Sequence, residues 1–447
     1  MDLSIQNPWW RTPAAIEEDE KVKEANSKSP MLLRKIDVSK NLLFLGPRQI
    51  GKTTSIKLTI QELLKHMNPR NILYFSCEPL DKKNDIIEII KEFDRVSPSG
   101  KKIVFLDEVT QIKGWELAIK YIIETELSKN KVVIATGSNA MLLKMGYERL
   151  PGRNIRTTLY LPLSFREFIM NFGSDELKKS VSNSKLDKFS ISDVARESKK
   201  LLPFLGEINR MLHIYLKTGG YPKTIYEFFE KGKIEEETYE IFVKWILGDL
   251  NRLDKKEHIF KSMVRGIIKN YCSKFSLHSF SKEMEISSHS TVSDYLDVFQ
   301  SLLLVNNLYQ VDLSKQLPVF RKERKCYFLD PLFYSVFSGY IYGKYRDYSE
   351  ENESKILEGV ICEAFSRMKR KYLDISGFLW FFTKNRETDF VFKDDFLFGI
   401  ELKWKENVEP KDFSNFHSFK HKLLLSKSDF HEGEILTVPV GIFLAIL

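Results

Sequence analysis

The sequence predicts an α/β protein that begins with a parallel β-sheet covered by helices on both faces. Short, continuously apolar runs alternate with stretches of helical spacing between residues 41 and 136. Strands that are apolar on both faces are typical of parallel sheets, because helices cover each face. After Pro162 this alternation stops, and the pattern predicts a largely helical region followed by a second group of strands.

The composition is that of a folded protein with several domains. The 447 residues are 43% hydrophobic and 29% charged, which excludes a fully disordered or fibrous chain. At about 100–200 residues per domain, this length predicts two to four domains. The net charge of +8 permits an acidic partner such as nucleic acid without demanding one.

The cysteines and the apolar runs predict a cytoplasmic protein without a membrane span. The cysteines are scattered and form no metal-binding spacing, so reduced thiols are expected. The N-terminus has no apolar signal-peptide core. The uncharged, apolar run at 435–447 has 13 residues, whereas a membrane span needs about 20. We interpret this run as one or two buried strands.

In the first third of the chain, each predicted strand is followed by a turn. After three of the four strands, the turn leads into an amphipathic helix. Beyond it, residues 164–250 are expected to be helical, with a mobile loop at 174–200. Three helices and a strand are predicted over 257–312, and a further helix at 410–422. The remaining predicted elements are strands at 41–45, 71–77, 101–109 and 131–136, a helix at 354–371, and the strands FLWFFT, TDFVF and LFGIELKW after it.

A phosphate-binding loop lies between the first strand and its helix. The pattern is GxxxxGK[ST], in the strand–loop–helix context that makes it specific. Glycines let backbone N–H groups turn toward phosphate oxygens, the lysine places a positive charge by the β- and γ-phosphates, and the Thr53 hydroxyl ligates Mg²⁺. The predicted ATP-binding residues are Gly46, Pro47, Arg48, Gln49, Ile50, Gly51, Lys52, Thr53 and Thr54.

Acidic and polar side chains follow the third and fourth predicted strands. Asp107 is expected to hold Mg²⁺ and Glu108 to polarise the attacking water. Ser138 or Asn139 would touch the γ-phosphate, or would cap the following helix instead. Either Arg149 or Arg153 would stabilise transition-state charge in a neighbouring subunit, unless they form surface ion pairs.

The motifs NPWW, GPRQIGKTT, VFLDEV, ATGS, LPGR, LPLSFREF and GGYP occur in this order. With them the chain resembles, over nearly its whole length, a group of archaeal and bacterial AAA+-like P-loop ATPases. The resemblance implies ATP-site roles for Gly46–Thr54, Asp107 and Glu108. It also implies a winged-helix segment and a C-terminal domain of uncharacterised function with a restriction-endonuclease-like fold. The expected segments are an N-terminal segment (1–35), the ATPase core (36–163), a helical lid (164–250), the winged helix (251–345) and the nuclease-like domain (346–447).

The winged-helix segment contains a helix-turn-helix pattern whose second helix starts near Thr291, capped by Ser290 with Ser288 in reserve. The exposed face of that helix carries Asp294 and Asp297, which would repel phosphate. A role of this helix in protein packing is therefore favoured slightly over recognition of DNA bases. If DNA binds, two flanking basic runs are the candidates for its backbone: Arg252, Lys255, Lys256, Lys261 and Arg265 upstream, and Arg321, Lys322, Arg324 and Lys325 downstream.

The C-terminal strands carry a D…ExK pattern. If the turn between them centres on Asp395, Asp389 lies opposite Glu401, with Lys403 on the same face. This is the metal site of restriction-type nucleases, in which the carboxylates hold Mg²⁺ and the lysine positions water or offsets charge. Glu358 is the expected third acid and Glu363 its reserve. The alternative is a cross-strand ion network without catalysis, and residues 354–447 carry 14 Lys and Arg against 14 Asp and Glu.

Two functions follow. The first is a Mg²⁺-ATP-dependent ATPase whose nucleotide state moves the winged helix and the C-terminal domain, which acts on or grips DNA or RNA. The alternative is a slow nucleotide-switched interaction protein whose C-terminal domain docks a protein partner without cleavage. The cofactors are ATP and Mg²⁺ in both, assembly of several copies is left open, and no membrane contact is expected.

Overall fold

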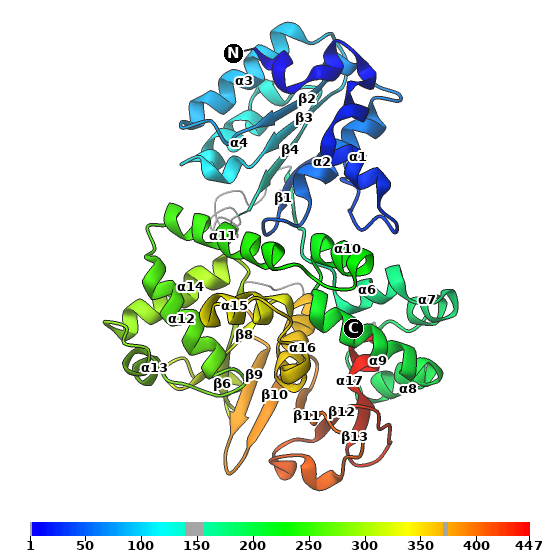
Figure 1. Ribbon diagram of the computed structural model, residues 1–447, viewed down its shortest axis with the longest axis vertical. Helices are drawn as coiled ribbons and strands as arrows, with labels where there is room; N and C mark the ends of the chain where they lie inside the picture. Colours follow the sequence, from blue (N-terminus) through cyan, green and yellow to red (C-terminus); the bar gives the residue numbers. More distant parts are fainter. Residues whose placement is uncertain (1, 139–154, 187, 370–373) are drawn as a thin grey trace. The chain divides into compact units, whose positions relative to one another are not determined.

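The computed structural model describes residues 2–138, 155–186, 188–369 and 374–447 (Figure 1). It divides into two compact units, Met1–Leu161 and Pro162–Leu447. The five segments expected from the sequence are a finer division than these units and stay predictions.

The first unit is built on a five-stranded parallel sheet in the order β2-β3-β4-β1-β5. This confirms the predicted fold class of a P-loop NTPase sheet. The fifth strand was not predicted, because its sequence IRTTL is polar and only partly buried. The strands are β1 (Asn41–Leu45), β2 (Ile72–Ser76), β3 (Lys102–Asp107), β4 (Lys131–Gly137) and β5 (Ile155–Leu159).

Helices flank this sheet on both faces (Figure 1). In α3 the buried Ile86, Ile89, Ile90 and Phe93 recur at helical spacing and form one apolar face. The α3 and α4 helices pack on each other, as do α1 and α2. The helices are α1 (Glu20–Ser27), α2 (Lys52–Leu63), α3 (Lys83–Val96) and α4 (Trp115–Glu124).

The N-terminal residues lie along the edge strand β2. Asn7 donates to the Tyr74 carbonyl at 2.9 Å and accepts from the Tyr74 amide at 2.7 Å. The Trp9 and Trp10 indoles donate to the Ile72 carbonyl at 3.2 and 2.8 Å, and the Gln6 side chain accepts from the Ser76 amide at 2.7 Å. Side chains of the NPWW segment therefore engage the outer backbone groups of β2.

The second unit begins with helices, including two in the segment expected to be a mobile loop. That expectation is wrong: Ser174 and Ser190 each accept a backbone N–H and cap a helix there. Short capped helices separated by polar residues resemble a loop in composition. The helices are α6 (Phe165–Phe172), α7 (Asp175–Ser182), α8 (Ile191–Leu201), α9 (Leu205–Thr218), α10 (Pro222–Lys231), α11 (Glu236–Arg252), α12 (Glu257–Lys269), α13 (Leu277–Glu283), α14 (His289–Ser301), α15 (Leu332–Tyr342), α16 (Glu353–Lys369) and α17 (Val440–Ile446).

A mixed sheet forms the rest of the second unit, in the order β13-β12-β11-β10-β9-β6-β7, with β8 paired to β6. Because β6 pairs with β9 in parallel, strands from the expected winged helix and from the expected nuclease-like domain share one sheet. The strands are β6 (Val305–Asp312), β7 (Leu317–Pro318), β8 (Arg324–Phe328), β9 (Leu379–Thr383), β10 (Glu387–Lys393), β11 (Leu397–Leu402), β12 (His421–Ser426) and β13 (Leu436–Pro439).

Three local predictions in this unit are corrected. The apolar tail, expected to form one or two buried strands, forms one strand followed by the helix α17. The helix was missed because a run that is apolar throughout shows no helical or strand periodicity. The helix expected at 410–422 is replaced by two single turns and the start of β12. The cap of α14 is Ser288, whose Oγ accepts from the Thr291 amide at 3.1 Å, rather than Ser290.

In the part of the chain that the structure describes, no helix is long and apolar enough to cross a membrane.

Candidate functional site

The loop after β1 has the backbone shape that phosphate binding requires. Gly51 ends it in the left-handed region with φ of 91°, and Gln49 also has a positive φ of 61°. At Gly46 an added Cβ would lie 2.1 Å from the Tyr160 carbonyl oxygen, so any side chain there would clash. Both glycines of the motif are therefore needed on steric grounds.

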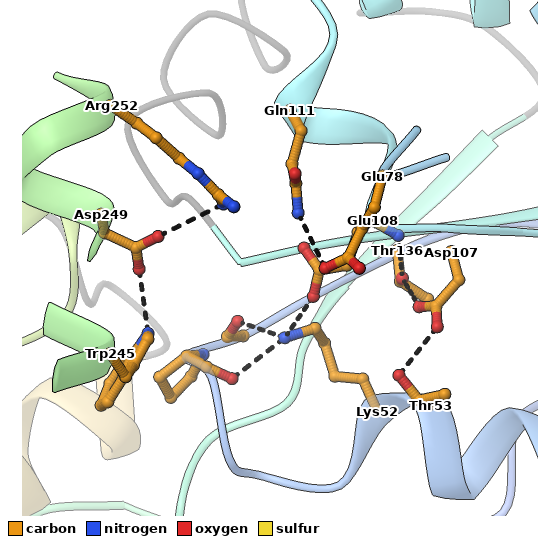
Figure 2. Close-up of polar contacts among 12 residues, drawn as sticks. Lys52, Thr53, Glu78, Asp107, Glu108, Gln111, Thr136, Trp245, Asp249 and Arg252 are labelled. Carbon is orange, nitrogen blue, oxygen red and sulfur yellow. Dashed lines mark hydrogen bonds and ion pairs between the residues drawn. The ribbon is translucent and has the colours of Figure 1, made fainter. Parts of the chain in front are cut away.

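Lys52 begins α2 and its side chain is buried. Its ammonium donates to the Gly46 and Pro47 carbonyls at 2.9 and 3.0 Å, and lies 3.5 Å from Glu108 Oε1 (Figure 2). Through these contacts the loop backbone surrounds the positive charge of Lys52. A phosphate group in the loop would meet that charge and the N-terminus of α2.

The sheet order brings the polar strand ends together, because β4 lies between the loop strand β1 and the acidic strand β3. Asp107, at the end of β3, is the centre of this group. Its Oδ2 accepts from Thr53 Oγ1 at 2.7 Å and from the Tyr74 hydroxyl at 3.1 Å, and its Oδ1 accepts from Thr136 Oγ1 (Figure 2). Burial and the Asp107 charge raise the pKa of Tyr74 well above its ordinary value, so this phenol stays a donor.

Glu108 follows Asp107 in the left-handed region, with φ of 56°. Its amide donates to Thr136 Oγ1 at 2.9 Å, so the Thr136 hydroxyl links the backbone of one acid to the side chain of the other. The Glu108 Oε2 is buried without a hydrogen-bond partner among the described atoms. Strained backbone and an unsatisfied buried oxygen are features that cluster at functional sites.

These donors fit a magnesium-bound nucleotide. Mg²⁺ prefers oxygen ligands and is usually held by one or two carboxylates together with substrate phosphates. The Thr53 hydroxyl and the Asp107 carboxylate already face each other, and Lys52 and the loop amides supply the charge and donors that phosphates need.

The other predicted ATP-site residues are distributed around this group. Ile50 is buried, so it anchors the loop by its side chain. Ser138 is buried just beyond the end of β4. Asn139, Arg149 and Arg153 lie outside the described residues. Thr136 was not predicted from the sequence, because only the sheet order shows that β4 lies beside β3. Its position, a hydroxyl residue at the end of a buried strand, could have marked it as a candidate.

We expect Thr136→Val to reduce ATP turnover by about 10- to 100-fold, because it removes the partner that orients Asp107. It also leaves the Glu108 amide and an Asp107 oxygen without this hydroxyl, which is expected to cost about 1–3 kcal/mol of unfolding free energy. Steady-state ATPase assays and thermal melts measure both effects. Thr136→Ser, which keeps the hydroxyl, is the matched control; a fully active Thr136→Val variant contradicts the role.

A second polar group lies in the C-terminal sheet of the second unit. Phe390 is opposite Ile400 and Lys393 is opposite Leu397 in the antiparallel pair, which is the register of a turn centred on Asp395. Extended by one residue, this register sets Asp389 opposite Glu401. Asp389 Oδ2 accepts from the Leu402 amide at 2.9 Å. Glu401 is 0% exposed and accepts from the Ser414 amide and from Lys403 Nζ, both at 3.1 Å.

Burial and the charge of Asp389 raise the pKa of Glu401 to about 8. Burial likewise raises the pKa of Glu358, on α16, to about 7; Lys325 opposes this shift and Asp389 adds to it. The Glu358 carboxylate accepts from the Tyr327 hydroxyl at 2.6 Å. The reserve acid Glu363 instead pairs with Arg367. Crowded, buried carboxylates of this kind attract a cation, since charge repulsion is relieved when one binds.

The donor set is compatible with Mg²⁺, which needs only one or two carboxylates. Asp389 and Glu401 are the acids next to the paired Phe390 and Ile400 of the hairpin. Among the described residues, no group of three or more His, Cys, Asp or Glu side chains is arranged around a common point suitable for a metal. The expected three-acid metal site is therefore not formed in the described part of the chain. Asp389 and Glu401 remain the candidate ligands, and Glu358 acts on them from outside through its charge.

The basic runs proposed for DNA are partly engaged within the protein. Arg324 and Lys325 are buried, so only Arg321 and Lys322 of the downstream run are exposed. In the upstream run, Lys255 pairs with Asp294 at 2.5 Å. Arg252 lies 3.8 Å from Asp249, a contact within the second unit that Figure 2 also draws.

Known proteins resemble the chain in separate parts. Residues 38–169 match a family described as an AAA domain, and residues 209–339 match a domain of unknown function, DUF8612. The uncharacterized protein MJ1637 of Methanocaldococcus jannaschii is 24% identical over 316 residues, 66% of this chain and 61% of that protein. An uncharacterized protein of Haemophilus influenzae is 27% identical over 284 residues, 60% of this chain and 62% of that protein. The chain thus spans about three fifths of both relatives.

Solved structures with some likeness include the RuvB Holliday junction branch migration motor of Thermotoga maritima. It matches 60% of this chain and 80% of its own at 16% identity, with a TM-score of 0.28. The Aeropyrum pernix Orc1 protein in complex with DNA matches 72% of this chain and 93% of its own at 12% identity, with a TM-score of 0.33.

Proposed function

We propose that this protein is a Mg²⁺-dependent ATPase of the AAA+ type whose nucleotide state moves its helical and C-terminal segments. The observation that carries the proposal is one connected group of polar contacts among Lys52, Thr53, Asp107, Glu108 and Thr136. It supplies a cation, a hydroxyl and two carboxylates of the kinds that nucleotide hydrolysis uses. The AAA domain match over residues 38–169 supports it.

In this proposal each residue of the site has a separate role in ATP hydrolysis. Lys52 offsets the charge of the β- and γ-phosphates, and Thr53 with Asp107 forms the place for Mg²⁺, which neutralises developing phosphate charge when bound. Glu108 accepts the proton of the attacking water, because its free Oε2 is the available base. Ser138 or Asn139 senses the γ-phosphate, and Arg149 or Arg153 reaches a neighbouring copy.

For the C-terminal sheet we propose a metal-dependent action on nucleic acid, with Asp389 and Glu401 as the ligand pair and Lys403 as the nearby cation. The supporting observation is that these charges meet on one patch of sheet, where Lys403 bonds Glu401 at 3.1 Å. Lys403 would position water or offset the charge of the attacked phosphate.

Incubation of purified protein with DNA or RNA and Mg²⁺ or Mn²⁺ tests this activity. We expect cleavage by the wild type and a loss of at least about 100-fold in Asp389→Ala, since metal stabilisation is worth several kcal/mol. Asp395→Ala is the matched control, because Asp395 is an exposed acid at the turn of the same hairpin. Absence of cleavage by the wild type, or cleavage that persists in Asp389→Ala, rejects the nuclease assignment.

The second candidate is a nucleotide-switched interaction protein whose C-terminal domain docks a protein without cleavage. One observation favours it: both oxygens of Glu401 are already bonded inside the protein, and its side chain is fully buried. The two candidates share the ATP site, so the cleavage assay separates them.

A further inference from the structure

Lys325 is a buried lysine beside the C-terminal carboxylates that the proposed cleavage chemistry does not use. Its side chain is 1% exposed, although it belongs to a basic run that the sequence made a candidate for contact with a DNA backbone. Burying an ammonium costs several kcal/mol unless partners compensate it. The partners of Lys325 therefore indicate why a charge is kept at this position.

The partners are two carboxylates from different elements. The Lys325 ammonium lies 2.6 Å from Glu387 Oε1 on β10 and 3.6 Å from Glu358 Oε2 on α16. In the sheet order β6 and β9 separate β8 from β10. The ion pair of Lys325 with Glu387 therefore joins strands that are not neighbours in the sheet. Glu387 lies two residues before Asp389 on β10, so its contact brings the Lys325 ammonium next to the acids of this strand. The charge of Asp389 acts on both Lys325 and Glu358, in keeping with this placement.

Tyr327 reinforces the same contact. It lies two residues after Lys325 on β8, so both side chains are on one face of the strand. Its hydroxyl donates to Glu358 Oε2 at 2.6 Å, the oxygen that Lys325 also approaches. The position of the Glu358 carboxylate is thus determined by β8 as well as by its own helix.

We propose that Lys325, together with Tyr327, is a positioning residue of the C-terminal metal site, holding Glu358 beside the Asp389–Glu401 pair. The inference rests on the proposed metal-binding function of that pair. Lys325 offsets the repulsion among Glu358, Glu387 and Asp389, so that several carboxylates can stay close together. It supports the acids from a strand of the expected winged-helix segment, and it is too buried to touch a substrate.

Calorimetric titration of the nucleotide-free full-length protein with Mn²⁺ tests the inference. Asp389→Ala defines the heat that belongs to the C-terminal site. Loss of a residue that supports metal ligands typically weakens metal binding by 10–100-fold, so Lys325→Met is expected to weaken Mn²⁺ binding by about that factor. Lys325→Arg keeps the charge and is expected to stay within about threefold of the wild type.

Lys422→Met is the matched control, because Lys422 is a buried lysine in the same sheet that pairs with Glu434 at 3.4 Å. It removes the same charge and should leave Mn²⁺ affinity unchanged. If Lys325→Met does not fold, Tyr327→Phe removes a single hydroxyl and is expected to weaken Mn²⁺ binding by about tenfold.

The outcomes separate the two proposals. A wild type that binds Mn²⁺ while Lys325→Met or, failing that, Tyr327→Phe binds it equally well or more tightly overturns the positioning role alone. A wild type whose Mn²⁺ titration is indistinguishable from that of Asp389→Ala overturns the metal-site assignment, and the positioning role with it. Weakening by Lys325→Met with rescue by Lys325→Arg supports both.

Discussion

Lys52→Ala is expected to weaken ATP binding by about 30-fold to several thousand-fold. The ammonium is buried and bonds the Gly46 and Pro47 carbonyls of the phosphate-binding loop, so its removal deletes the loop's central charge as well as its internal support. Truncating one partner of a buried, hydrogen-bonded charge pair costs about 2–5 kcal/mol, and each 1.4 kcal/mol is about tenfold in affinity. Calorimetric titration with Mg²⁺-ATP measures the effect.

The control for this experiment is Lys65→Ala. Lys65 lies just beyond the end of α2, its side chain is 66% exposed and it pairs with Glu62 at 2.7 Å, so ATP affinity should not change. A circular dichroism spectrum equal to that of the wild type shows that Lys52→Ala still folds. Unchanged ATP affinity in folded Lys52→Ala protein would refute the nucleotide site and every role built on it.

Glu108→Gln is expected to keep ATP binding and to lower turnover by about 10²–10⁴-fold, the usual contribution of a general base. Glutamine has the shape of glutamate but cannot accept the proton of the attacking water. The backbone bond from residue 108 to Thr136 Oγ1 does not involve the side chain, so the surrounding geometry should persist. Phosphate release at saturating ATP measures turnover, and calorimetry measures binding.

Glu78→Gln is the matched control, since Glu78 is an exposed carboxylate that accepts from Gln111 at 3.3 Å and is drawn beside Glu108 in Figure 2. Turnover of this variant should equal that of the wild type. If Glu108→Gln hydrolyses ATP at the wild-type rate, the base is another group and the assignment of Glu108 is wrong.

The parts of the molecule that could be predicted are those whose determinants lie close together in sequence. The strand, loop and helix around Gly46–Thr53 are contiguous, and the parallel sheet follows from apolar runs that need helices on both faces. The register of the β10–β11 hairpin, with Phe390 opposite Ile400, could be anticipated because the turn length of a short hairpin determines its register.

The missed features depend on contacts between distant segments. Thr136 joins Asp107 and Glu108 only because β4 lies beside β3 in the sheet. Lys325 resembles a surface cation in sequence, and only the packing of β8 against α16 and the tertiary fold of the second unit bring it to Glu387 and Glu358. Local patterns carry no information on such pairings, since they arise from tertiary packing.

The contacts between the N-terminal residues and β2 also determine what this sheet can join. An edge strand with free N–H and C=O groups is a template for another chain, and unprotected edges lead to aggregation or domain swapping. Here Gln6, Asn7, Trp9 and Trp10 bond the outward groups of β2 at Ser76, Tyr74 and Ile72 with side chains instead of a strand. Side chains cannot continue the backbone hydrogen-bond ladder to a further strand, so addition of another strand is blocked at this edge of the first unit.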